Sequence, residues 1–280
     1  MKVIFFTDLH GAKHKYNASL DLVKSLKADV VINGGDMLPF GGNLFKQGKF
    51  ITNFLDPYFS ELNKSKIYHL GYLGNDDLII FDELYEDICN KYDYIIPIAQ
   101  YRFELKGFEF IGMNWIVDYP FILKDRARMD DDDYKFQEQL GEALLSTING
   151  WKKLNDWQTY VKSLPTIKTE INDKLIHPND MSKAIYIIHM PPANIKLDVC
   201  QHGPSVGSTA IYDFIKRKQP KLSFHGHIHE CFDVTGVWKA KIGNSICIQP
   251  GQTPKREKTL VYVIGDLITM KFERCIEHIS

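Results

Sequence analysis

The sequence has little excess of charge of either sign and no long apolar run. Its 34 lysine and arginine residues nearly balance its 35 aspartate and glutamate residues, so the formal net charge is only -1. A nearly neutral chain has no overall field that attracts nucleic acid or an anionic membrane. No stretch approaches the roughly 20 consecutive apolar residues that span a bilayer. We therefore expect neither nucleic acid nor a membrane as a partner.

Cysteine is also scarce, and it is not arranged in pairs. The five cysteines are scattered along the chain, and no two of them have the CxxC spacing. This pattern argues against a disulfide framework and favours a reducing cytoplasm as the setting. The apolar run at the N-terminus is interrupted by Asp8 and His10, so we interpret it as a first strand and not as a signal peptide.

The first hundred residues have the pattern of a parallel α/β sheet. Short β-rich runs alternate there with helical spacing, which is typical of such a sheet. The expected strands are 3–7, 30–33, 67–73 and 94–98, and the expected helices are 16–27, 50–63 and 78–90. Pro57 predicts a kink or a restart in the second helix, because proline cannot continue the helical hydrogen bonding.

Antiparallel strands are predicted from residue 101 onward. Lys106–Gly107 would turn a hairpin between 101–105 and 108–112, and Gly243–Asn244 and Gly265–Asp266 would form later tight turns. Further strands are expected at 185–188, 222–224, Val234, 237–242, 245–248, 259–264 and 267–272, and a helix at 209–218. With 44% hydrophobic residues, the chain can form one sizeable core. We predict a single α/β domain over 1–280, with two mixed sheets packed face to face and helices outside.

The segment 119–182 has a different character and is predicted to be a helical insertion. From Phe136 to Leu164, apolar residues recur every three or four positions, which predicts a long amphipathic helix that Asn149–Gly150 could divide. The acidic run 130–133 precedes it, where negative charge favours a helix N-terminus. We expect this insertion to pack on the core. The alternative is a cap over the site that selects the substrate.

Side chains that can bind metal ions follow the predicted strands of the first half. Asp8 and His10 lie two residues apart, so they would point to the same side of an extended chain. Asp36 follows the second strand after two glycines, and Asn75 follows the third strand after one. Ligands collect at the carboxyl ends of parallel strands, where Asp36 could bridge two cations. Carboxylate and imidazole together suit a transition metal such as Mn, Fe, Co, Ni or Zn.

The second half supplies histidines at matching positions. His189 directly follows the strand 185–188, and two prolines then end the sheet. After the strand 222–224, His227 and His229 share one face of an extended stretch, whereas His225 points away. Because five polar clusters coincide with strand ends, we interpret them as one metal site.

Taken in order, these blocks resemble the calcineurin-like metallophosphoesterase superfamily. The matching blocks are Asp8-Leu9-His10, Gly35-Asp36, Gly74-Asn75-Asp76-Asp77, His189 and Gly226-His227-Ile228-His229. They span residues 8 to 229, and outside them the match is thin, above all at 119–182. The resemblance implies a four-layer αββα sandwich with its site at the strand ends.

The resemblance also implies two divalent metal ions, such as Mn, Fe, Zn, Ni or Co. One would be bound by Asp8, His10, Asp36 and His229, and the other by Asp36, Asn75, His189 and His227, with Asp36 bridging. Two such ions lower the pKa of a bridging water, which attacks phosphorus, and they clamp the phosphoryl oxygens. The implied function is hydrolysis of a small phosphate ester or nucleotide, with Asp36, Asn75 and Asp76 as catalytic residues. We favour diesters.

One position departs from the family pattern. Where the family commonly has histidine after the asparagine, this sequence has Asp76. Asp76 either is protonated and gives its proton to the leaving oxygen, or it bonds a ligand histidine and holds it in place. We favour the second interpretation, and we interpret Asp77 as structural.

Other functions and contacts stay open. A phosphomonoesterase or a nucleotide pyrophosphatase would use the same site, and a non-catalytic metal-binding scaffold would use the fold to bind a protein partner. Arg126 and Arg128 could contact a substrate phosphate, although we favour solvated charge for both. His202 could line the pocket, and Ser208 is expected to cap the helix 209–218.

Overall fold

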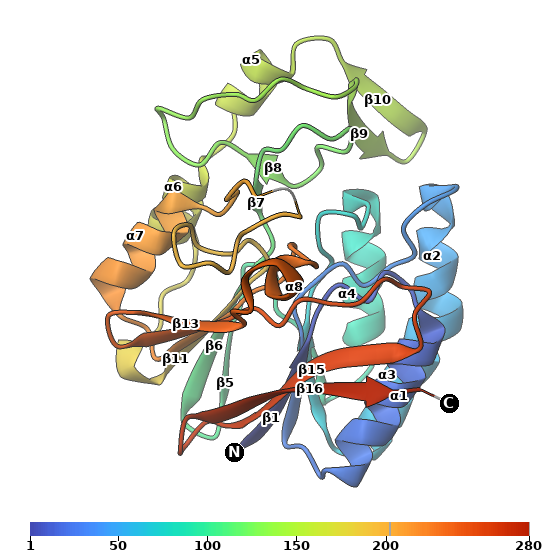
Figure 1. The fold of residues 1–280 in the computed structure, drawn as a ribbon. Coiled ribbons are helices and arrows are strands. Elements are labelled where there is room, and N and C mark those ends of the chain that lie inside the picture. Colours follow the sequence, from blue (N-terminus) through green and yellow to red (C-terminus); the bar gives the residue numbers. More distant parts are fainter. Residues whose placement is uncertain (202, 280) are drawn as a thin grey trace.

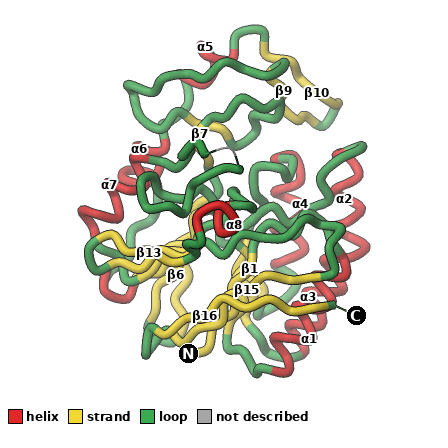
Figure 2. The backbone as a smooth tube through the Cα atoms, in the orientation of Figure 1, coloured by secondary structure: helices red, strands yellow, loops and turns green. Residues whose placement is uncertain are grey.

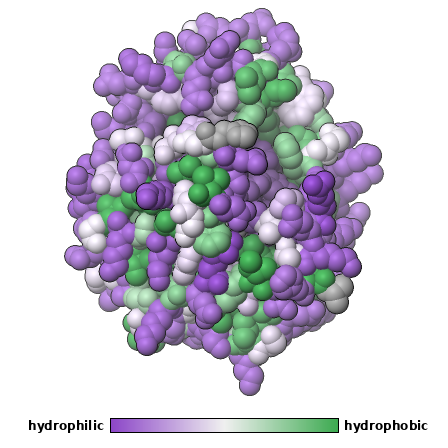
Figure 3. Space-filling view, in the orientation of Figure 1, coloured by the Kyte–Doolittle hydropathy of each residue, from purple (hydrophilic) through white to green (hydrophobic). Residues whose placement is uncertain are grey.

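Two six-stranded sheets form the centre of the computed structural model, which describes residues 1–201 and 203–279. Figures 1 and 2 show the strands in the middle of the body and the helices on its outer sides. Hydrophilic side chains cover most of the face drawn in Figure 3. In the described part of the chain, no helix is both long enough and apolar enough to cross a membrane.

The first sheet is built from the N-terminal half and the last hairpin. Its order is β16-β15-β1-β2-β3-β4, in which β1 to β4 are parallel and β15 is antiparallel to β1. The strands are β1 (Lys2–Phe6), β2 (Val30–Asn33), β3 (Tyr68–Gly71), β4 (Ile95–Pro97), β15 (Thr259–Asp266) and β16 (Lys271–His278). The apolar run of β2 is buried at every position, as expected for a central parallel strand.

Helices cover the outer face of this sheet. They are α1 (Lys13–Ser25), α2 (Gln47–Phe50), α3 (Asp56–Lys64) and α4 (Asp82–Cys89), with 3₁₀ turns at Leu44–Lys46 and Ile79–Phe81. Between α2 and α3 the helix continues through a π-helical turn, Ile51–Leu55, which precedes Pro57. The irregularity predicted at Pro57 is therefore confirmed. Proline cannot donate the regular helical hydrogen bond, and a wider turn accommodates the loss.

The second sheet comes mostly from the C-terminal half. Its order is β13-β14-β12-β11-β6-β5, with parallel pairs at the centre and antiparallel pairs at both edges. The strands are β5 (Arg102–Leu105), β6 (Phe108–Met113), β11 (Ala184–Ile188), β12 (Leu222–Phe224), β13 (Lys239–Ile242) and β14 (Ser245–Ile248). The helix α7 (Thr209–Lys218) packs on its outer face, and α8 (Cys231–Thr235) follows β12.

Three apolar cores separate the layers. One lies between the sheets, where the rings of Phe5 and Phe224 are 4.6 Å apart. A second joins the first sheet to α1, α3 and α4, and a third joins the second sheet to α7. The predicted αββα arrangement of two mixed sheets flanked by helices is confirmed.

The segment 119–182 is not the long helix that the sequence predicted. It follows β7 (Ile116–Val117), and it contains β8 (Ala127–Arg128), β9 (Ala143–Thr147), β10 (Gly150–Leu154), α5 (Trp157–Lys162), α6 (Ile167–Thr169), a π turn Glu170–Lys174 and a 3₁₀ turn that begins at Met181. Figure 1 places most of it as a separate layer above the sheets.

A hairpin replaces the centre of the predicted helix. Thr147 pairs with Gly150, so Ile148 and Asn149 form the two-residue loop. Gly150 has φ of 114°, which glycine adopts without the strain that a side chain would add, and this local preference outweighed the helical spacing. Ile148 is 87% exposed and Leu140 is 73% exposed, so the apolar positions do not form one buried face.

Two smaller predictions near the C-terminus are also wrong. Val234 lies in α8 and not in a strand. The last turn falls after Asp266 and not at Gly265–Asp266, because the Asp266 carboxylate accepts hydrogen bonds from the backbone N–H groups of Ile268 and Thr269. That the whole chain is one domain with an insertion stays a prediction.

Candidate metal centre

Four of the predicted ligands, which lie on the loops after β1, β2 and β12, have an unusual backbone conformation. Asp8, His10, Asp36 and His227 all have positive φ, at 58°, 43°, 50° and 71°. The assumption of an extended chain is therefore wrong here. Non-glycine residues adopt this conformation only where surrounding contacts impose it, and such strain clusters at functional sites.

Backbone hydrogen bonds impose it by joining the loops. The N–H of Asp8 donates to the carbonyl of Gly35 at 3.0 Å, and the N–H of His10 donates to the carbonyl of Asp36 at 2.9 Å. The N–H of His227 donates to the Asp8 carboxylate at 3.1 Å, which connects the second sheet to the first. These contacts fix the side chains before any ligand binds.

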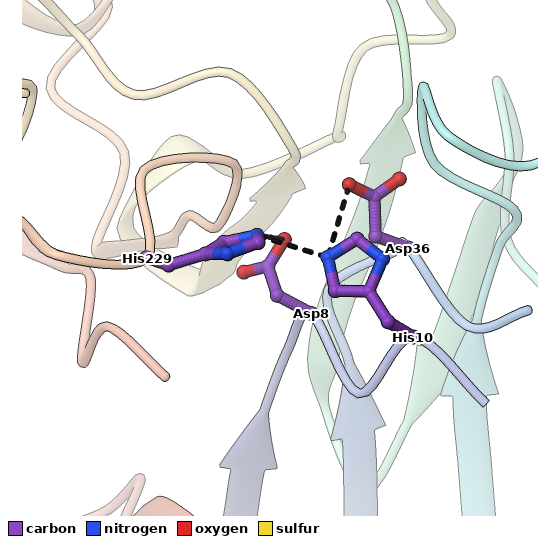
Figure 4. A group of neighbouring side chains, drawn as sticks. All are labelled: Asp8, His10, Asp36 and His229. Carbon is purple, nitrogen blue, oxygen red and sulfur yellow. Dashed lines mark hydrogen bonds and ion pairs between the residues drawn. The ribbon is translucent and has the colours of Figure 1, made fainter. Parts of the chain in front are cut away.

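The first cluster comprises Asp8, His10, Asp36 and His229 (Figure 4). One ligand atom from each lies within 4.8 Å of the others. The Nε2 atoms of His10 and His229 are 3.0 Å apart, and His229 Nε2 is 3.5 Å from Asp8 Oδ1. Nitrogen and oxygen ligands lie about 2.0–2.2 Å from a zinc-like ion, which puts neighbouring ligand atoms at about 3–3.5 Å from each other. Two of the distances fall in this range, and the third, from His10 Nε2 to Asp36 Oδ2, is slightly longer at 3.9 Å.

The second cluster comprises Asp36, His189 and His227. His189 Nε2 lies 3.5 Å from Asp36 Oδ2 and 2.8 Å from the amide oxygen of Asn75. The structure thus brings all seven predicted ligands together at the carboxyl ends of the strands, and we call this edge of the two sheets the rim. Asp36 belongs to both clusters.

Hydrogen bonds orient the histidine rings. His189 Nδ1 lies 2.7 Å from the carbonyl of Gly34 and donates to it, which leaves Nε2 directed at the cluster. His225 faces the other way, as predicted, because its Nδ1 lies 3.0 Å from the carbonyls of Ile188 and Met190.

The charges of the rim are strongly coupled. Burial disfavours the charged carboxylates, but His189 and His10 lower the pKa of Asp36, and His229 lowers the pKa of Asp8. Burial likewise opposes protonation of His189 and His229, but Asp36 and Asp8, respectively, raise both histidine pKa values to about 9. Without a metal ion these carboxylates and imidazoles therefore favour each other's charged forms, and metal binding would release protons from the histidines.

The rim also contains unsatisfied polar atoms that fit a cation. Asp8 Oδ2 and His10 Nδ1 are buried without a hydrogen-bond partner. Among the described residues, no lysine or arginine forms an ion pair with Asp8 or Asp36. Carboxylate oxygens and imidazole nitrogens that share so small a buried space are the ligands of transition-metal sites, so the donor set fits divalent ions.

The residues after Asn75 have separate positions. Asp77 is fully buried, and its carboxylate accepts hydrogen bonds from the N–H groups of Met37, Leu38 and Gly74, which ties the loop after β2 to the loop after β3. Asp76 is 20% exposed, and its Oδ2 lies 3.7 Å from His10 Nδ1. Burial, together with the charge of Asp36, raises the pKa of Asp76.

Tyr119 is a neighbour of the site that sequence reasoning missed. Its hydroxyl lies 3.2 Å from Asn75 Nδ2 and accepts a hydrogen bond from it, while its ring lies 5.7 Å from the ring of His227. No local motif marks this tyrosine. Its position depends on how the segment 119–182 crosses the rim.

The two arginines of that segment are neither solvated nor free for a phosphate. Arg126 is buried and bonds the carbonyl of Gly74 and the carboxylate of Asp82. Arg128 stacks on Trp115, 3.8 Å from the ring centre. Ser208 caps α7 as predicted, because its hydroxyl accepts from the N–H of Ile211. His202 lies outside the described residues.

Comparisons with known proteins agree with this geometry. A family model described as calcineurin-like phosphoesterase matches residues 1–231. The search of curated proteins found no match. Among solved structures, 71 chains match.

Three of these solved structures cover 100% of this chain and are themselves covered to 99%. The first is 18% identical with a TM-score of 0.61. The protein TT1561 of Thermus thermophilus is 14% identical with a TM-score of 0.58. A dimetal phosphatase from Danio rerio is 11% identical with a TM-score of 0.51. At these identities the likeness shows a shared fold.

Proposed function

This chain belongs to the calcineurin-like phosphoesterase family, and from that premise we propose that it hydrolyses phosphodiesters at a centre of two divalent metal ions. The family makes it a metal-dependent phosphoesterase. The observation that supports a centre of two metal ions is the sharing of Asp36 between two groups of ligand atoms. A carboxylate has two oxygens and can bridge two cations, whereas an imidazole cannot.

The residues divide between two ion sites. Asp8, His10, Asp36 and His229 would hold one ion, and Asp36, Asn75, His189 and His227 would hold the other. When bound, two divalent ions supply Lewis acidity and lower the pKa of a water between them. Which of Mn, Fe, Zn, Ni or Co is present is a matter for metal analysis.

The protein's own contribution is to fix the ligands in place. Asp76 accepts a hydrogen bond from Asn75 Nδ2 at 3.1 Å and lies close to His10 Nδ1. The 3.7 Å separation is an ion-pair contact and not a hydrogen bond, and a carboxylate on that side of the imidazole favours the orientation with Nε2 facing the ion. These contacts support Asp76 as a positioning residue, whereas its raised pKa supports the role of the acid that protonates the leaving oxygen.

Replacing Asp76 distinguishes the two roles. If Asp76 positions His10, Asp76→Asn lowers metal affinity and slows esters with good and poor leaving groups by a similar factor. If Asp76 is the acid, the variant slows only esters with poor leaving groups. A similar kcat loss across leaving groups, together with weaker metal binding, is the expected result.

The preference for diesters follows from charge. Asp76 and Asp36 lie side by side at the rim, with the N–H of Asp76 bonded to Asp36 Oδ1 at 2.9 Å. A phosphomonoester dianion carries one more negative charge than a diester, and among the described lining residues no lysine or arginine offsets that charge. The absence of the usual family histidine also removes a cationic partner for that charge.

A substrate panel tests the proposal. Protein purified without chelator is assayed with Mn²⁺ on p-nitrophenyl phosphate, its bis-ester and a nucleotide diphosphate. We expect the highest kcat/KM on the bis-ester. The highest value on the monoester or on the nucleotide would favour a phosphomonoesterase or a nucleotide pyrophosphatase instead.

Metal analysis tests the alternative of another class, a non-catalytic scaffold. About two ions per chain and turnover that chelator abolishes are the expected results. Bound metal without turnover on any ester would support the scaffold. The cytoplasmic setting stays a prediction from the scattered cysteines.

A further inference from the structure

A large cavity opens directly above the two ligand clusters. Its volume is about 1290 Å³, and its floor includes Asp36, Asn75, Asp76, His227 and His229. A phosphoryl group occupies only a small part of such a volume, because a cavity for a whole drug-sized ligand is about 300–1,000 Å³. Most of the space is therefore available to the organic part of a substrate.

Apolar side chains from several parts of the chain form the walls. The segment 119–182 contributes Phe121, Ile122 and Trp151, and the loop after β2 contributes Phe40. All four are exposed large apolar side chains. The ring of Trp151 packs against that of Phe45, with ring centres 4.9 Å apart. Exposed apolar side chains that gather around one cavity mark a site for an apolar ligand.

The described part of the walls offers no lysine or arginine to a second anionic group. Two basic side chains of the segment are engaged, since Lys124 pairs with Asp118 at 2.6 Å and Arg126 pairs with Asp82. Lys255, beside the wall, donates to the carbonyl of Phe40. A polyphosphate or a nucleic acid would need such cations beyond the metal ions.

The acidic side chains of the walls also do not form a site for a cationic group. Asp118 accepts from Lys124 and from Trp157, and Asp130 accepts from the Ser208 hydroxyl and the first N–H groups of α7. Glu230 accepts from the N–H of Gln201, and Asp131 accepts from the N–H of Asp133. These carboxylates are used within the protein, and their remaining charge repels anions.

We infer that the substrate is a phosphate ester with a large, apolar and uncharged organic group, such as an aryl or long alkyl group, and with no second anionic group. The inference rests on the proposed function and narrows it. The phosphoryl group would lie at the rim, and the organic group would lie against Phe121, Trp151 and Phe40.

The test uses a series of p-nitrophenyl phosphodiesters with one leaving group. The second substituent is methyl, octyl, or an octyl-length chain that ends in a carboxylate, assayed with the Mn²⁺-loaded enzyme below the micelle concentration. We expect kcat/KM to be at least tenfold higher for octyl than for methyl, because buried methylenes leave water. We expect the terminal carboxylate to lower kcat/KM at least tenfold relative to the octyl ester.

The outcomes separate the two proposals. If none of the three esters is hydrolysed, the proposed function fails and the inference fails with it. If the methyl ester is hydrolysed but octyl and carboxylate esters match it within twofold, only the inference is overturned.

A matched pair of variants tests the placement of the organic group. Phe121→Lys adds a cation to the wall at a side chain that is 58% exposed, so folding should tolerate it. We expect it to raise the ratio of kcat/KM for the carboxylate ester over the octyl ester at least fivefold. The control is Ile268→Lys, at a turn residue 73% exposed outside the cavity walls, which should leave the ratio unchanged. An unchanged ratio in Phe121→Lys would overturn the placement.

Discussion

The rim of the two sheets and the segment 119–182 above it are held in place by different interactions. At the rim, backbone hydrogen bonds between loops set the ligand positions, as with Asp8 and Gly35. The segment has a small core of its own around Trp157 and Val161, and buried polar side chains such as Arg126 join it to the rim. The rim is therefore fixed by the fold of the sheets, and the segment by a few specific pairs. This difference predicts where a substitution alters chemistry and where it alters stability.

The largest expected effect is at the rim. Asp36→Asn removes one anionic oxygen from both clusters at nearly constant side-chain volume, so we expect both ions to be lost or weakly bound. Turnover should fall by about a thousandfold or more. Asp21→Asn, at an exposed position in α1, is the control for a lost surface charge. Activity above a tenth of the original would contradict a shared carboxylate.

The next effect is on stability and belongs to the segment. Lys124 and Asp118 form a buried pair, and both side chains are fully covered. Lys124→Met leaves the Asp118 charge buried without its partner, which costs about 3 kcal/mol of unfolding free energy. Urea unfolding followed by tryptophan fluorescence measures the loss.

The matched control is the double variant Lys124→Met with Asp118→Asn. It removes both charges and keeps an acceptor for the Trp157 N–H. It should recover at least half of the lost stability. Equal losses in the single and double variants would mean that packing, and not the charge pair, holds the segment.

The sequence predicted the rim better than the segment for the same physical reason. Parallel strands of β1 to β4 place their carboxyl ends together, so residues after them meet whatever the details of the loops. The meeting of Asp8 with Asp36 was therefore foreseeable although their left-handed conformation was not. In the segment, no sheet imposes positions, and spacing alone suggested a helix that Asn149–Gly150 instead turned into a hairpin. Tyr119 was invisible because its role depends on that tertiary arrangement.

Acidification should affect the body of the first sheet through His69. This histidine of β3 is fully buried beside Phe59, and burial lowers its pKa to about 3. The unfolded chain binds a proton near pH 6.5, whereas the folded chain does not, so stability falls as the pH drops below that value. Between pH 6.5 and 5, this residue should account for a loss of about 2 kcal/mol.

A comparison of variants isolates this contribution from the other histidines. His69→Leu should show a shallower decline of unfolding free energy over that range than the natural protein. His278→Leu, at an exposed position in β16, should show the natural decline. Parallel curves for all three proteins would exclude His69 as the cause.

The smallest expected effect is at the hydrogen bond from Asn75 to Tyr119, which connects the two regions directly. Its acceptor is the Tyr119 hydroxyl, and the amide oxygen of the same Asn75 faces His189. Tyr119→Phe removes the acceptor but keeps the ring, so Asn75 loses one of the contacts that orient it. A neutral hydrogen bond contributes about 0.5–1.5 kcal/mol, which predicts a decrease of about two- to twelvefold in affinity for the ion that Asn75 would hold. The other ion should be unaffected, because Asn75 is outside that cluster.

Metal titration of Tyr119→Phe against Tyr160→Phe, whose ring packs on Trp157 in α5, makes the comparison. Equal weakening of both ions would mean that the segment acts on the rim as a whole, and not through this one amide.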